Sequence, residues 1–165
     1  MERLKRHKRI KTISWVVVLL WMGLIFYASA QPAIQSKELS GTVTEIVVMA
    51  VERVAPNKAA TLNTGTMHHF IRKTAHFFLY FLLGILVLNA TRGLRVYGLK
   101  GMILTFSICI LYAVYDEFHQ TFVLGRSGEI RDVLIDTSGA IVGVLWWLGV
   151  SRFIKRCKKY QQVTD

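Results

Sequence analysis

Four long apolar segments alternate with polar, largely basic segments along the chain. The apolar segments cover residues 13–30, 75–89, 101–115 and 133–150, and each holds at most one histidine, acidic or basic residue. A helix needs about 20 mainly apolar residues to cross the hydrocarbon core of a bilayer. The second and third segments reach that length only when the ionisable residues at their ends also lie inside the membrane.

This pattern predicts an all-α, polytopic membrane protein with four transmembrane helices and one external amphipathic helix. We expect a single domain over residues 1–165. Its predicted parts are spans at about 13–30, 70–91, 101–122 and 132–150, an external loop 31–69, and cytoplasmic tails 1–12 and 151–165.

The external amphipathic helix is predicted from apolar residues that recur at helical spacing between Leu39 and Val54. Thr42 and Glu45 form a possible capping box at its start, Ser36 is an equally good start, and Pro56 ends the run. Such a helix either lies on the outer membrane surface or covers apolar surface of the bundle. The sequence leaves both interpretations open.

Positive charge is concentrated in alternate segments. The net charge is +11, and the basic residues gather before residue 13, between residues 92 and 100, and after residue 151. A basic chain invites a nucleic-acid interpretation, but this alternation is typical of cytoplasmic loops. We therefore expect both termini in the cytoplasm and no nucleic-acid partner.

The first apolar segment has two interpretations. A basic start, an apolar run and Ala28-Ser29-Ala30 before Gln31 resemble a cleavable signal peptide. The segment is longer than a usual signal core and contains Trp15 and Trp21, which favours a helix that stays in the protein.

Ionisable residues cluster at one end of each of the last three spans. With the amino terminus inside, all three clusters lie in the outer leaflet at similar depth. Helical spacing also gives each of these spans one polar face. The face of the second span is formed by Lys73, His76 and Tyr80, and that of the fourth span by Asp132 and Asp136. The face of the third span is formed by Asp116, His119 and Gln120, with Glu117 beside them. Because charged side chains in a membrane are costly, they mark a functional site that faces the bundle interior.

Gly139 and Gly143 share a helix face with Asp132 and Asp136. Glycines four residues apart allow another helix to approach closely. This coincidence directs the two aspartates into the bundle.

Several chemistries fit these clusters. Carboxylates beside histidines can transfer protons, so the catalytic candidates are His76, Glu117, His119 and Asp132. Arg72, Lys73 and Arg126 could hold a phosphate or carboxylate group. The substrate-binding candidates are Lys73, Tyr80, Asp116, Gln120, Arg126 and Asp136. A divalent metal on the histidines and carboxylates is a weaker alternative, and neither a metal nor another cofactor is expected. A third alternative is a structural network that satisfies itself.

Three ordered motifs resemble the VanZ-like family. They are Arg72-Lys-Thr-Ala-His-Phe, Asp116-Glu-Phe-His-Gln-Thr-Phe-Val-Leu-Gly-Arg126, and Asp132-Val-Leu-Ile-Asp136-Thr-Ser-Gly-Ala140. Leu124 stands where that family often has proline. The family is named for a protein associated with teicoplanin resistance, so the resemblance implies a bacterial cell membrane and a cell-envelope role, but no particular reaction.

Two functions of different classes follow as hypotheses. The first is an enzyme that acts on a lipid-linked cell-envelope component and contributes to glycopeptide (teicoplanin-type) resistance. The second is a non-enzymatic membrane protein whose buried network is structural or binds a lipid or antibiotic. The expected partners are membrane lipids, a lipid-linked cell-wall precursor or a lipoglycopeptide.

Overall fold

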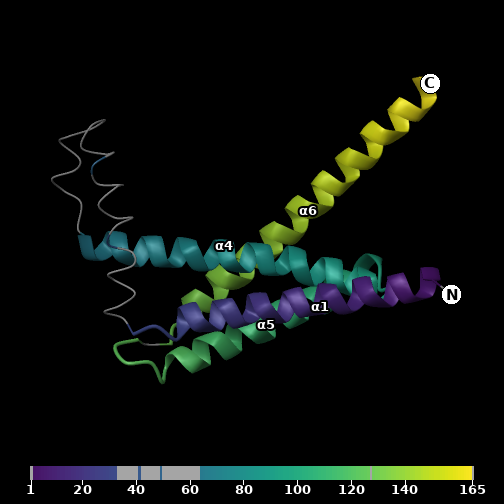
Figure 1. Ribbon diagram of the computed structural model, residues 1–165. Helices are drawn as coiled ribbons and strands as arrows, with labels where there is room; N and C mark the ends of the chain where they lie inside the picture. Colours follow the sequence, from purple (N-terminus) through teal and green to yellow (C-terminus); the bar gives the residue numbers. More distant parts are fainter. Residues whose placement is uncertain (1, 33–40, 42–48, 50–63, 127, 165) are drawn as a thin grey trace.

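The computed structural model describes residues 2–32, 41, 49, 64–126 and 128–164. Its four long helices are α1 (Glu2–Ser29), α4 (Thr64–Gly93), α5 (Gly98–Gln120) and α6 (Ile130–Thr164) (Figure 1). The described part of the chain contains no strand. The predicted external helix falls, apart from Gly41 and Met49, outside the described residues.

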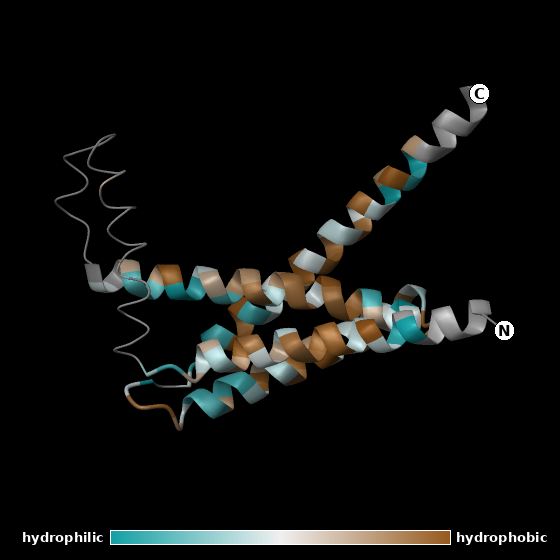
Figure 2. Cartoon of the chain, in the orientation of Figure 1, coloured by the Kyte–Doolittle hydropathy of each residue, from teal (hydrophilic) through white to brown (hydrophobic). Residues whose placement is uncertain are grey.

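Each of the four helices contains a stretch long and apolar enough to cross a membrane. These stretches are Lys11–Ser29, Met67–Gly93, Gly98–Gln120 and Ile130–Cys157. Figure 2 shows apolar residues through the middle of the helices and hydrophilic ones gathered toward the left ends of α4 and α5. The protein is therefore an all-α, multi-pass membrane protein, as the sequence predicted.

Helix α4 is the centre of the arrangement, because it packs against each of the other three. Its contact with α6 is the most extensive, although these helices are not neighbours in sequence. Helices joined by short connections also pack together, α4 with α5 and α5 with α6. The backbone of helix α1 lies closest to α4, and α1 meets α5 chiefly through side chains.

Glycines account for the close approach of α4 and α6. A Cβ atom added at Gly139 or Gly143 would overlap the backbone carbonyl of Phe77 or Phe81, respectively. A Cβ at Gly84 would lie 2.5 Å from the carbonyl oxygen of Ala140. Such backbone-to-backbone contact is open only to small residues, so the glycine stripe serves the packing predicted from the sequence.

Helix α1 is tied to the bundle by buried apolar residues and by side-chain hydrogen bonds. Val18 and Ile25 are fully buried in the core. Trp21 Nε1 donates to the Leu79 carbonyl at 2.9 Å, and the Tyr112 hydroxyl donates to the Met22 carbonyl at 2.5 Å. These contacts join α1 to both α4 and α5.

A short turn joins α5 to α6 and brings their polar ends together. Gly125 has a φ of 75°, a left-handed conformation that glycine adopts without strain. The backbone N–H of Glu129, just before α6, donates to Glu117 Oε1 at 2.6 Å. Glu117 therefore fixes the start of α6 against the end of α5.

Candidate functional site

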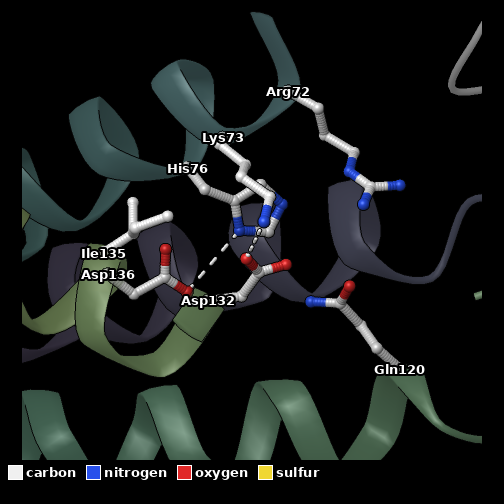
Figure 3. A pocket seen from close by; sticks show the side chains of 7 residues that line it. All are labelled: Arg72, Lys73, His76, Gln120, Asp132, Ile135 and Asp136. Carbon is white, nitrogen blue, oxygen red and sulfur yellow. Dashed lines mark ion pairs between the residues drawn. The ribbon is translucent and has the colours of Figure 1, made fainter. Parts of the chain in front are cut away.

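A small polar pocket lies between α4, α5 and α6, near the end of α5 and the start of α6 (Figure 3). Its free volume is about 10 Å³, about the space that one water molecule needs. Its lining residues are Arg72, Lys73, His76, Gln120, Asp132, Ile135 and Asp136. The three ionisable clusters predicted to share depth and an inward face thus meet here.

Lys73 forms the strongest charge pairing of the pocket. Its Nζ atom lies 2.8 Å from Asp132 Oδ1 and 3.4 Å from Glu129 Oε2. The side chains of Lys73 and Asp132 are 27% and 15% exposed. This cross-helix pair links α4 to the first turn of α6.

A histidine and two aspartates form the deepest part of the site. His76 Nδ1 lies 3.6 Å from Asp136 Oδ2, and the Ser29 hydroxyl of α1 donates to Asp116 Oδ2 at 2.8 Å. His76, Asp116 and Asp136 each offer one potential metal-ligand atom, and these atoms all lie within 4.8 Å of one another. The same three side chains could hold a divalent ion or exchange a proton.

Gln120 connects the carboxylates of α5 with Arg126 in the following turn. Its Nε2 atom lies 3.4 Å from Glu117 Oε2 and 3.5 Å from Asp116 Oδ2. Its Oε1 atom accepts a hydrogen bond from Arg126 Nη1 at 3.1 Å. A half-buried guanidinium is thereby held beside the pocket.

Two guanidinium groups repel each other at this end of the bundle. Burial lowers the pKa of Arg126, and the charge of nearby Arg72 lowers it further, against the opposing effect of Asp116, Glu117 and Asp132. Arg126 remains a cation, because a guanidinium group is not deprotonated in proteins. An anion placed between Arg72 and Arg126 would relieve their repulsion.

Several buried polar atoms of the site have no hydrogen-bond partner among the described residues. They are Tyr80 Oη, Asp116 Oδ1, His119 Nδ1, Arg126 Nε and Asp136 Oδ1. Buried polar atoms in folded proteins are rarely left unpaired. A network that existed only to hold the helices together would be expected to satisfy itself.

A family model described as VanZ/LLP1 matches residues 14–153, which is most of the chain. The chain belongs to the VanZ/LLP1 family. No curated protein and no solved structure matches the chain. The matched region contains α4, α5, most of α1 and α6, and every residue of the pocket, so the site lies within the family domain.

The predicted site residues of this VanZ/LLP1-family protein fall into three groups. Lys73, His76, Gln120, Asp132 and Asp136 line the pocket. Asp116, Glu117 and Arg126 are not lining residues, but hydrogen bonds of Gln120 join them to the lining.

The third group consists of His119 and Tyr80, which do not line the pocket. The His119 ring lies against Phe26 of α1, with 4.3 Å between ring centroids. Tyr80 is fully buried in the apolar core, where its ring faces Tyr112 at 6.1 Å. Their predicted roles as acid–base and substrate-binding residues remain predictions.

Glu129 and Ser29 also belong to the site and were absent from the candidates named from the sequence. Glu129 pairs with Lys73, and Ser29 reaches Asp116 from α1. Arg72, which was expected to hold an anion with Lys73 and Arg126, lines the pocket. For Ser29 the sequence offered two interpretations, because Ala28-Ser29-Ala30 is also typical of a signal-peptide cleavage site.

Proposed function

We propose that this VanZ/LLP1-family membrane protein recognises the anionic head group of a lipid-linked cell-envelope component at the polar pocket, and that this recognition contributes to resistance to teicoplanin-type antibiotics. The observation that carries the proposal is the electrostatic environment and unmet hydrogen bonding of the Arg126 guanidinium. The positive charge of Arg72 acts on this guanidinium, and its buried Nε–H lacks an acceptor among the residues that the structure describes. Phosphate and carboxylate groups are the natural partners of such an arrangement.

The size of the pocket defines how the head group enters. A volume of about 10 Å³ does not admit a phosphate group beside the present side chains. Arg72 and Lys73 are only partly buried, and long side chains of this kind change rotamer readily. Binding therefore involves displacement of these two side chains from the mouth of the pocket.

The groups beneath the mouth allow chemistry as well as binding. His76 lies beside Asp136 and within reach of Asp116, so a proton donor or acceptor stands next to the proposed head-group position. In the enzymatic form of the proposal, His76 transfers a proton to or from the bound component. In the binding form, the protein changes the availability of that component without altering it.

The test compares cells that carry the wild-type protein with cells that carry Arg126→Gln, Glu117→Gln or His76→Ala. Loss of one charged hydrogen bond to a bound anion weakens binding by about 10- to 100-fold, so Arg126→Gln should abolish the antibiotic phenotype. Arg131→Gln and His69→Ala are matched controls, since both residues are exposed and lie outside the pocket.

The pool of lipid-linked precursors separates the two forms of the proposal. If cells with the wild-type protein hold a different amount of lipid-linked precursor from cells with the Glu117→Gln or His76→Ala variant, the protein is an enzyme. A lost phenotype with an unchanged pool indicates binding alone. An unaltered phenotype in Arg126→Gln cells, with normal protein abundance, would contradict the proposal in both forms.

A further inference from the structure

A second and larger cavity lies at the opposite end of the bundle from the polar pocket. Its free volume is about 390 Å³, and it is bounded by the end of α4, the turn into α5 and the last part of α6. Figure 1 shows α6 crossing α4 and then leaving it toward the carboxy terminus. The cavity, here named the basic cleft, lies between these diverging segments.

Positive charge in the basic cleft has no acidic partner among the residues that the structure describes. Arg92, Arg152 and Lys155 line the cleft, and its lining contains no acidic residue. None of the ion pairs within the described part of the chain involves these three residues. The cleft therefore offers a concentrated positive potential to an anion.

The rest of the lining is largely apolar and aromatic. Leu88, Tyr97, Met102 and Trp147 contribute to it. Trp147 is held in place by a hydrogen bond of 3.0 Å from its Nε1 atom to Asn89 Oδ1. Apolar walls below a basic rim fit a molecule that joins an anionic group to a hydrocarbon chain.

We infer that the basic cleft binds an anionic phospholipid, with its head-group phosphate between Arg92, Arg152 and Lys155 and an acyl chain against the apolar walls. Basic pockets between transmembrane helices are known to select anionic head groups. The inference stands apart from the polar pocket, because the two cavities share no residue. It assigns a lipid site to the end of the protein where the sequence predicts the cytoplasm.

Purified protein in a neutral detergent provides the test. Phosphatidylglycerol, phosphatidylcholine and inorganic phosphate are titrated separately, and the melting temperature and lipid retention in native mass spectrometry are measured. A ligand that binds the folded state raises its stability. We expect phosphatidylglycerol to raise the melting temperature and to be retained, and the other two to have little effect.

Charge variants locate the site. The triple variant Arg92→Gln/Arg152→Gln/Lys155→Gln should bind phosphatidylglycerol about 100-fold more weakly, since each cation near an anionic surface contributes about 1 kcal/mol. The control Arg95→Gln/Lys100→Gln/Arg156→Gln removes the same charge from exposed residues outside the cleft and should bind like the wild type.

Three outcomes would overturn the inference. Equal binding of phosphatidylglycerol and phosphatidylcholine by the wild type would show that charge does not select the lipid. This result does not depend on whether the variants fold. Equal weakening in both triple variants would show a general charge effect without a site. If inorganic phosphate raised the melting temperature as much as phosphatidylglycerol does, the cleft would bind phosphate and not a lipid.

Discussion

At the level of single side chains, the polar end of the bundle is held by pairs that cross between helices. The Lys73–Asp132 contact of 2.8 Å is the shortest ion pair among the described residues, and both partners are largely shielded from solvent. Removing one partner of a shielded pair costs more than removing one partner of an exposed pair, because the remaining charge is left partly buried and unpaired. This pair therefore offers a measure of how strongly the site holds α4 to α6.

We expect Lys73→Gln and Asp132→Asn each to lower the free energy of unfolding by about 1–3 kcal/mol, because each leaves a partly buried charge without its closest partner. The double variant should lose less than the sum, with a coupling energy of about 1 kcal/mol or more. Thermal unfolding in detergent measures all three variants. The control is the double variant Lys73→Gln/Arg152→Gln, whose second site lies at the far end of the bundle, so its two changes in unfolding free energy should add. If the changes for Lys73→Gln and Asp132→Asn also add, the pair contributes nothing to stability.

Side-chain positions were predictable from the sequence only along single helices. The spacing of Lys73 and His76, and of Asp132 and Asp136, fixed their common faces, and these four residues do line the pocket. Contacts between distant segments were not predictable in this way. Ser29 meets Asp116 across 87 positions of sequence, and no local pattern specifies such a partner.

At the level of helices, the bundle depends on the glycine contact between α4 and α6. Hairpin neighbours could be predicted from short connections, and both predicted pairings occur. The glycine spacing predicted close packing of α6 but did not name its partner. The place of α1 on α4 was not predictable, because a uniformly apolar helix has no face that distinguishes one neighbour from another.

Gly143→Ala should lower the stability of the protein by about 1–3 kcal/mol, because the added methyl group would overlap the backbone of Phe81 and separate the helices. Gly149→Ala is the matched control in the same helix, since a Cβ there meets nothing within 4 Å. Its effect should be neutral or slightly stabilising, because alanine favours helix. Melting curves of both variants in detergent measure these effects. Equal melting temperatures would contradict the role of Gly143 in packing α6 against α4.

At the level of the whole molecule, charge is distributed unequally between the two ends of the bundle. The polar pocket and its carboxylates lie at one end, while the basic cleft and the basic tail of α6 lie at the other. Basic segments are retained in the cytoplasm. The same bias therefore predicts that the polar pocket faces the outer leaflet.

Topology reporters test this orientation. Fusions after Asn63 and after Lys158 should report an external and a cytoplasmic position, respectively, because the second follows the basic end of α6. A fusion at the amino terminus should also report the cytoplasm. An external signal from the fusion after Lys158 would reverse the predicted orientation and place the pocket in the inner leaflet.

The hydrogen bond between Ser29 and Asp116 has a consequence for how the protein is made. Because Ser29 ends the first helix and Asp116 lies near the end of the third, their bond can form only after three helices have left the ribosome. His76 must wait still longer for Asp136, which belongs to the last helix. During synthesis, Ser29 and His76 therefore leave the ribosome before the aspartates that they contact. Because an unpaired polar group in hydrocarbon is costly, we expect both side chains to stay in contact with water or the insertion machinery until those aspartates follow.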